Sequence, residues 1–348
     1  MSTSILYVNS TTVSLSPSSP SLIQSIMFAL LLGLLFPSVL CFAFVFNSFI
    51  SLRELRIQPI NRFIILLLII NFTQIIVDLP FRLYYLSQSI VLIQNAFFCR
   101  FWVWYDSTLS TINLYIMAIS SIERYIFVFH RIYYVRYSLL SFRISTFTSI
   151  LIPTAWYTGF IFFYPCTNRP SYINFQCGAL CYISSSPTVN QVENYAYLIL
   201  PILIIVFTNS LLVFQVLIEK RRVTRNDGMR LWRKNVRMIS QLFSVAILYI
   251  CVYIPSVVLV FIIIFSSNSQ TRAWAIRTRV SYFYHLKYLV IFGCPFMVLA
   301  SQTKMHEKIK RFIRFCCLQQ QGRNTNQVIP LTTMKPSFIG RQRLTTNK

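Results

Sequence analysis

A few charged residues of this chain fall inside long apolar stretches, where ionisable side chains are rare and usually functional. Among the 8 acidic residues, Asp78, Asp106 and Glu193 lie in such stretches, and so does the basic residue Lys287, next to Tyr288. Lys287 is able to neutralise Asp106 in an ion pair that holds two helices together. The other use of such a carboxylate is to contact a ligand, and the sequence leaves both interpretations open.

The sequence contains no pattern that indicates catalysis or metal binding. No nucleophile stands beside a base, the 7 glycines form no phosphate-binding loop, and the 3 histidines and 9 cysteines form no ligand cluster. A formal net charge of +24 would favour nucleic acid in a soluble protein, but these basic residues flank apolar runs, as the flanks of membrane spans do. We therefore expect no enzymatic activity, no cofactor, no metal and no nucleic-acid partner.

The composition places the chain in a membrane. Of its residues, 55% are hydrophobic and 11% are charged, against about 25% charged residues in an average soluble domain. A helix needs about 20 apolar residues to cross a bilayer core. We expect an all-α membrane protein, a bundle of seven transmembrane helices at approximately Leu22–Ile50, Arg62–Leu86, Ala96–Tyr125, Arg143–Pro165, Tyr195–Ile218, Met238–Ser266 and Val280–Ser301.

The distribution of Lys and Arg predicts the orientation, because short basic loops stay in the cytoplasm. With the amino terminus outside, the inner segments hold 25 of the 32 basic residues and the outer segments hold 7. Residues 1–21 are then an extracellular tail, and residues 22–302 form the transmembrane domain of a multi-pass plasma-membrane protein. The tail contains an acceptor tripeptide for glycosylation at Asn9.

A short amphipathic eighth helix is predicted directly after the seventh span, at residues 303–317. Its apolar residues share one face and its basic residues lie mostly on the other, which favours a position on the lipid of the inner leaflet. Cys316 and Cys317 at its end are candidates for palmitoylation. The polar residues 318–348 show no periodicity and indicate a disordered cytoplasmic tail.

The third span carries a line of polar residues on one helical face. At 100° per residue, Cys99, Asp106, Asn113 and Arg124 lie within about 20° of a common direction. Lipid does not tolerate such a face, so it must point into the bundle. Asp106 precedes Arg124 by 18 residues, which is about 27 Å of helix at 1.5 Å per residue. The two side chains therefore belong to opposite halves of the bundle.

These features resemble the rhodopsin-like (class A) G-protein-coupled receptors, in a divergent, invertebrate-type form. In that family a cysteine opens the third helix and an acidic-Arg-Tyr triplet closes it. Cys99 and Glu123-Arg124-Tyr125 have this arrangement, with 25 residues from the cysteine to the arginine. The resemblance also rests on Asn61, Asn71 and Leu79-Pro80 in the second span and on the helix-kinking prolines Pro201, Pro255 and Pro295.

The resemblance implies a receptor that binds an extracellular ligand and activates a heterotrimeric G protein through the triplet Glu123-Arg124-Tyr125. It implies helix hinges at the three prolines. It also implies a disulfide between Cys99 and the second outer loop, where Cys177 is the first choice of partner and Cys181 the alternative.

The same resemblance suggests candidate ligand residues. In the amine receptors, an Asp at the position of Asp106 pairs with the ammonium group of the ligand, and a Tyr at the position of Tyr288 assists it. Tyr253 stands where the family usually has a Trp in the sixth helix. The candidate ligand-binding residues are therefore Asp106, Lys287, Tyr288 and Tyr253.

Several other positions depart from the family pattern. Cys294 precedes Pro295 where an Asn is usual, and Asn71 replaces the Asp of an allosteric sodium site. Asn235 stands at the foot of the sixth helix, where many members keep a carboxylate that holds the arginine of the triplet. Two alternatives therefore remain beside a signalling receptor: a receptor-like scaffold that does not signal, and a seven-span transporter or channel. The ligand class, whether chemosensory, peptide or amine, also stays open.

Overall fold

The computed structural model describes residues 21–53, 59–129, 131–167, 170–178, 180–222, 226–301 and 305. The predicted tail containing Asn9 lies outside these residues. The predicted eighth helix with Cys316 and Cys317 also lies outside them, apart from Met305, and so does the carboxy-terminal tail 318–348.

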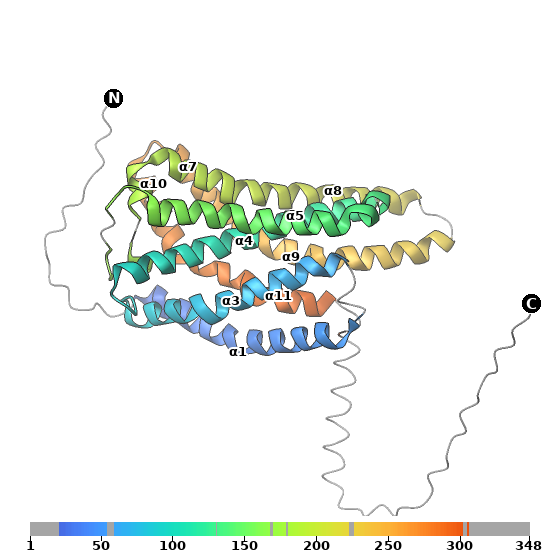
Figure 1. The fold of residues 1–348 in the computed structure, drawn as a ribbon, viewed down its shortest axis with the longest axis horizontal. Helices are drawn as coiled ribbons and strands as arrows, with labels where there is room; N and C mark the ends of the chain where they lie inside the picture. The colour runs from blue at the N-terminus through green and yellow to red at the C-terminus, as the bar shows by residue number, and fades with distance from the viewer. Residues whose placement is uncertain are drawn as a thin grey trace, which may run out of the picture. The chain divides into compact units, whose positions relative to one another are not determined.

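Helices make up almost all of the described chain, and no strand occurs in it. Most of the chain is in long helices that lie side by side along one direction (Figure 1). These helices are α1 (Leu22–Ser51), α3 (Pro59–Gln88), α4 (Ala96–Phe129), α5 (Arg131–Thr158), α8 (Leu200–Arg222), α9 (Asn226–Phe265) and α11 (Tyr284–Ser301).

The helices have the length and composition of membrane spans. Six helical stretches of the described chain are long and apolar enough to cross a bilayer, and α4 is the seventh long helix. α4 differs because it carries buried polar side chains, including Asp106, Asn113 and Arg124, along the face that points into the bundle. The predicted all-α bundle of seven transmembrane helices is confirmed.

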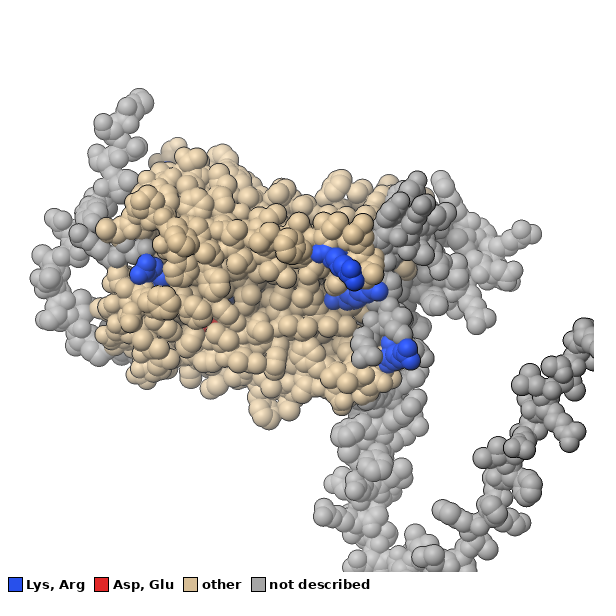
Figure 2. All heavy atoms as spheres, viewed as in Figure 1, with Lys and Arg blue, Asp and Glu red and all other residues tan. Residues whose placement is uncertain are grey.

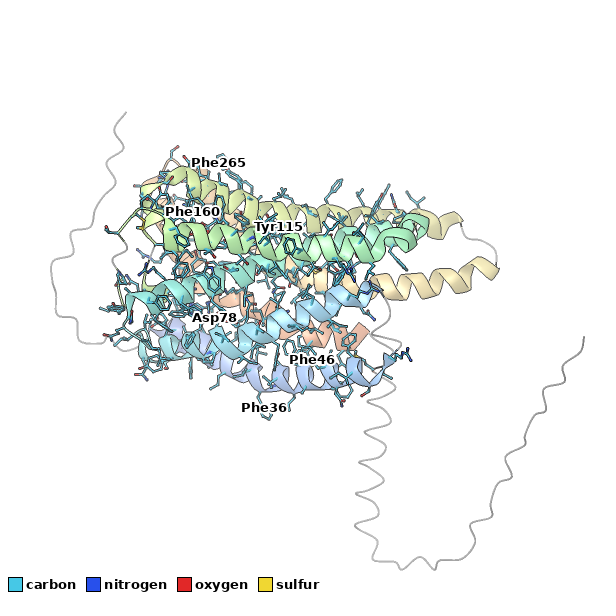
Figure 3. All side chains as sticks on the ribbon, in the orientation of Figure 1. Phe36, Phe46, Asp78, Tyr115, Phe160 and Phe265 are labelled. Carbon is cyan, nitrogen blue, oxygen red and sulfur yellow. A yellow bond between two sulfur atoms is a disulfide. The ribbon has the colours of Figure 1, made fainter. Side chains whose placement is uncertain are left out.

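The outward faces of the helices are apolar, as contact with lipid requires. Phe36 on α1 is 72% exposed and projects away from the bundle (Figure 3). In Figure 2 the Lys and Arg side chains lie toward the two ends, and the surface between them is almost entirely without charge. A soluble protein would not expose such a band.

The contacts between the long helices close a ring that passes through α4, and α5 packs against α4. α1 contacts α3 and α11, α9 lies between α8 and α11, and α4 contacts α3, α5, α8 and α9. Gly293 allows α11 to approach α9 closely, since a Cβ atom at this position would lie 2.6 Å from Leu248 Cδ2. Residues on α4 can therefore meet side chains from most of the other helices.

One end of the bundle, which we call the disulfide end, carries both disulfides of the described chain. Short helical elements connect the long helices here: η2 (Phe175–Cys177), α6 (Cys181–Ser185), α7 (Pro187–Asn194) and α10 (Ser269–Thr278). α7 and α10 lie at the left of Figure 1. The opposite end, which we call the Arg124 end, contains the carboxy-terminal part of α4 with the Glu123-Arg124-Tyr125 triplet.

Three of the long helices change to π-helix toward the disulfide end. These five-residue turns are η1 (Gly159–Phe163) after α5, η3 (Tyr195–Ile199) before α8 and η4 (Arg279–Phe283) before α11. Pro201 is the second residue of α8, directly after η3, while Pro255 and Pro295 lie within α9 and α11. Each proline lacks the N–H that a continuous helix would use, so the ladder of hydrogen bonds is interrupted at these points.

Candidate functional site

Asp106 on α4 is the centre of a buried charge cluster near the disulfide end. Its Oδ1 pairs with Lys287 Nζ from α11, and its Oδ2 lies 3.2 Å from Arg82 Nη2 of α3. Gln176 Nε2 donates a hydrogen bond of 2.6 Å to the same Oδ2. The side chains of Asp106 and Lys287 are only 10% and 11% exposed. The structure thus contains the ion pair that the sequence left as one of two interpretations, with Arg82 as a second cation.

Asp78 on α3 is the second acid of the cluster, and Figure 3 shows it among the helices. Its Oδ1 accepts a hydrogen bond of 2.6 Å from Trp102 Nε1. Its Oδ2 accepts from the Tyr288 hydroxyl and from Arg82 Nη2, the latter at 3.3 Å. Arg82 Nη1 also donates to the Tyr284 carbonyl oxygen at 2.7 Å. The Asp78 and Arg82 side chains are fully buried, so their mutual contacts replace water.

Helical geometry explains how these charges meet. Asp78 and Arg82 are four residues apart, so they lie on the same face of α3. Lys287 and Tyr288 are adjacent on α11 and point about 100° apart, which lets the lysine reach Asp106 and the tyrosine reach Asp78. The two carboxylates are matched by two cations, so the cluster is neutral. Buried charges persist only when they are paired in this way.

The connection that follows α5 covers the cluster. A disulfide joins Cys177 in this connection to Cys99 at the start of α4. Next to it, the Phe175 ring lies over Arg82, with 4.8 Å from the guanidinium carbon to the ring centroid, and Gln176 bonds Asp106. Cys177 was the first choice of partner for Cys99. The disulfide fixes the two side chains of the loop against the cluster.

A second disulfide joins Cys181 to Cys166 within the same connection. The sequence did not predict this bond: Cys181 was expected only as the alternative partner of Cys99, and the structure pairs it with Cys166 instead. The bond closes a loop of 15 residues, so it stiffens the connection itself and adds no link to α4.

Glu193 on α7 lies in a group of hydroxyls apart from the charge cluster. Its Oε2 accepts a hydrogen bond of 2.9 Å from the Tyr182 hydroxyl, and Tyr157 also donates to the carboxylate. Burial raises the pKa of the Tyr182 phenol, which therefore stays protonated as a donor. Within the described residues Glu193 makes no ion pair.

A chain of amides links three helices in the middle of the bundle. Asn113 Nδ2 on α4 donates to Asn71 Oδ1 on α3 at 2.6 Å, and the Tyr249 hydroxyl on α9 donates to Asn113 Oδ1 at 2.7 Å. All three side chains are buried. Asn71 stands where the resemblance described above expects a sodium-binding Asp, and here its amide oxygen accepts the hydrogen bond from Asn113. In the described part of the chain, no three His, Cys, Asp or Glu side chains are grouped for a metal ion.

Arg124 is buried at the opposite end of α4, 4% exposed. Its Nη2 donates to Ser120 Oγ at 3.0 Å, while its Nε and Nη1 have no hydrogen-bond acceptor among the described residues. Asn235 lies in α9, but its side chain is outside the described part of the structure. A buried guanidinium with two groups unsatisfied is costly and usually functional.

The neighbours of Arg124 in the triplet bind other helices. Ser141 on α5 donates a hydrogen bond of 3.1 Å to Glu123 Oε1, and Gln215 Nε2 on α8 donates one of 3.0 Å to the Tyr125 hydroxyl. The three residues of the triplet thus face three different surroundings. Glu123 and Tyr125 anchor α4 to its neighbours.

The structure brings only two of the four predicted ligand-binding residues into contact with each other through an ion pair. Asp106 and Lys287 form one pair, but Tyr288 bonds Asp78, and Tyr253 stacks on Tyr249 with 5.9 Å between ring centroids. Among the described residues no hydrogen bond joins Tyr253 to the cluster.

Sequence reasoning missed Arg82 and Gln176. Arg82 is one of the 7 basic residues assigned to the outer segments, and its spacing of four residues from Asp78 is a signal for a pair on one helix face. Gln176 had no such signal, since its position depends on the loop and on the Cys99–Cys177 disulfide.

The comparison with protein families agrees with this architecture. The model of the family described as 7 transmembrane receptor (rhodopsin family) matches residues 43–291, well over half of the chain. None of the curated proteins compared with the chain matches it. The matched range begins within α1 and ends within α11, so it includes the charge cluster, the amide chain and the Arg124 triplet. The chain belongs to the rhodopsin family of seven-transmembrane receptors.

Proposed function

We propose that this receptor binds an extracellular ligand at the charge cluster of the disulfide end and activates a heterotrimeric G protein at the Arg124 end. The observation that carries the proposal is the buried Arg124, with two N–H groups that have no acceptor in the described residues. Such a group is available for a new acceptor once the helices separate. Both sites lie on α4, so one helix connects them.

The orientation in the plasma membrane is supported by two independent features. Disulfides form and persist on the oxidising, extracellular side, and both disulfides of the described chain lie at one end. The segments assigned to the other side carry 25 of the 32 basic residues, as cytoplasmic segments do. The disulfide end then faces outward, with glycosylation at Asn9, and palmitoylation of Cys316 and Cys317 anchors the chain to inner-leaflet lipid.

In cells that co-express a panel of G proteins, we expect nucleotide exchange above vector control, and we expect Arg124→Met to abolish it. The surface level of the variant should stay equal or rise, because the substitution removes a buried charge of which two N–H groups have no acceptor among the described residues. Exchange on membranes and surface labelling measure the two quantities.

Arg143→Met is the matched control, because Arg143 is exposed at the same end of the bundle and its loss should leave exchange unchanged. Equal exchange in Arg124→Met and wild type would contradict the proposed role. The absence of exchange on every G protein would instead favour the receptor-like scaffold.

Asn235→Glu is expected to lower basal exchange several-fold. The substitution restores an acid where many relatives keep one, and a carboxylate there can pair with Arg124 and stabilise the inactive bundle. Basal exchange is compared at equal surface level, with Asn235→Gln as the uncharged control. If Glu and Gln have the same effect, the charge is not what restrains Arg124.

A further inference from the structure

The loop turn that covers the charge cluster has an uncommon backbone. Gln176 and Cys177 both have positive φ values, 52° and 60°, a region that residues with a Cβ atom rarely adopt. The turn is held by backbone bonds from Cys177 N to the Asn174 carbonyl and from Ser171 N to the Cys177 carbonyl, each 2.9 Å. The Cys99–Cys177 disulfide ties it to α4. Such strain persists where its surroundings fix the conformation, and often at functional sites.

This turn places an aromatic ring against a buried cation. The Phe175 ring lies 4.8 Å from the Arg82 guanidinium carbon and contacts Trp102 and His285, with centroid distances of 5.6 Å and 4.9 Å. It also packs on Tyr85 at 5.3 Å. The Phe175 ring is therefore packed among aromatic side chains and lies over the guanidinium group of Arg82.

The neighbouring residue of the turn supplies a neutral hydrogen-bond donor. Gln176 Nε2 lies 2.6 Å from Asp106 Oδ2. Asp106 and Lys287 keep a small exposed fraction, while Asp78 and Arg82 have none. Asp106 is thus the acid of the cluster that an incoming molecule can reach.

The guanidinium of the cluster has a donor without an acceptor among the described residues. Arg82 Nε is buried and has no hydrogen-bond partner among the described residues. The charges of the cluster already balance, with Lys287 and Arg82 against Asp78 and Asp106. An added cation would upset this balance, whereas a neutral group with one donor and one acceptor would not.

From these contacts we propose that Phe175 and Gln176 are a tethered occupant of the ligand site, and that the ligand that displaces them is an aromatic carboxamide. Its ring takes the place of Phe175 over Arg82, its amide N–H donates to Asp106, and its carbonyl oxygen accepts from Arg82 Nε. This inference rests on the proposed ligand-binding function. It gives the cluster a ligand class, which neither the family nor the charge pairs alone provide.

The test uses the purified full-length receptor and its thermal unfolding, with 3-phenylpropanamide, which has one aromatic ring and one carboxamide, as the probe. The variant Phe175→Ala/Gln176→Ala should unfold at a lower temperature than wild type, and the probe should restore the lost stability. The probe should leave wild type almost unchanged, because the loop fills the site. Phe98→Ala removes a ring from the same end without emptying the place over Arg82, so the probe should not stabilise it.

Two further probes test which chemical groups of the ligand the site recognises. Methyl 3-phenylpropanoate keeps the ring and the carbonyl oxygen but has no N–H group, so at least about tenfold more of it should be needed for the same stabilisation. Phenethylamine carries the ring and a cation, and it should stabilise the variant less than the amide does. Equal stabilisation of wild type and variant, no stabilisation of the variant, or a preference for phenethylamine would each overturn the inference.

A milder variant covers the case in which the double variant does not fold. Gln176→Ala retains the Phe175 ring and opens only the donor position, so acetamide should stabilise it and N,N-dimethylacetamide, which has no N–H, should not. Equal effects of the two amides would again contradict the inference. These measurements need no G protein, so a failure of nucleotide exchange and a failure of probe binding can be told apart.

Discussion

Asp106→Asn is expected to reach the cell surface at a small fraction of the wild-type level. In this variant Lys287 and Arg82 are left with Asp78 as the only carboxylate of the cluster. Breaking a buried ion pair by removing one partner costs about 3–5 kcal/mol, which is a large share of a typical folding free energy of about 5–15 kcal/mol. Surface labelling and thermal unfolding of the purified protein measure the loss.

Adding Lys287→Met to this variant should restore most of the surface level, because the second substitution removes the stranded ammonium. The coupling between the two sites is read from a double-mutant cycle. Glu193→Gln is the control, since it neutralises another acid, half-buried, that makes no ion pair within the described residues. Normal expression of Asp106→Asn without coupling to Lys287→Met would favour the other interpretation, in which Asp106 receives a cationic ligand.

Arg82→Met should have an equal or larger effect on surface level and on the unfolding temperature. Arg82 contacts both carboxylates and also donates to the Tyr284 carbonyl oxygen at 2.7 Å. Its removal leaves two buried acids with one cation, and the expected cost is again at least about 3–5 kcal/mol. Arg82→Lys should recover little, because an ammonium is a point charge without the planar fork that reaches several acceptors at once.

Neutralising the second acid is the internal check on this expectation. Arg82→Met/Asp78→Asn leaves a single pair, Asp106 with Lys287, and should recover much of the lost stability. Arg100→Met, a change of charge outside the cluster at the beginning of α4, is the control and should be tolerated. If Arg82→Lys behaves as wild type, the bonds to several acceptors have no energetic role.

The seven spans could be predicted from composition because a bilayer imposes a length of apolar helix that few other constraints disturb. α4 shows where this signal weakens: it was predicted from its apolar length as Ala96–Tyr125, but it is not among the six helical stretches of the described chain that are apolar enough to count as spans. The spacing of Cys99, Asp106, Asn113 and Arg124 gives this helix a polar face. A polar face on a membrane helix is rare because lipid disfavours it, and for that reason it indicates which side of the helix points into the bundle.

The candidate site was only partly predictable. The Asp106–Lys287 pair followed from the scarcity of buried charges, but the choice between an ion pair and a ligand contact needed the distances. The contact between Gln176 and Asp106 could not be predicted, because Gln176 lies in a turn with positive φ values that a disulfide holds in place. Such a turn has no helical or strand periodicity in its sequence from which side-chain directions could be inferred. Tyr288 lay close to the expected place and bonded the other acid, because one residue along a helix changes direction by about 100°.

A π-helical turn adjoins three of the long helices of this receptor, at Gly159–Phe163, Tyr195–Ile199 and Arg279–Phe283. A π turn holds about one residue more than an α turn, so the side chains beyond it are rotated by about 100° relative to a continuous helix. Each turn separates the end of its helix that leads into the connections of the disulfide end from the part of the helix in the packed middle. Gain or loss of such a residue would re-aim the side chains of those connections, Glu193 among them, while Lys287, Tyr288, the amide chain and the Arg124 end keep their packing. The fold thus allows the connections at the disulfide end to change their orientation without rebuilding the packed middle of the bundle.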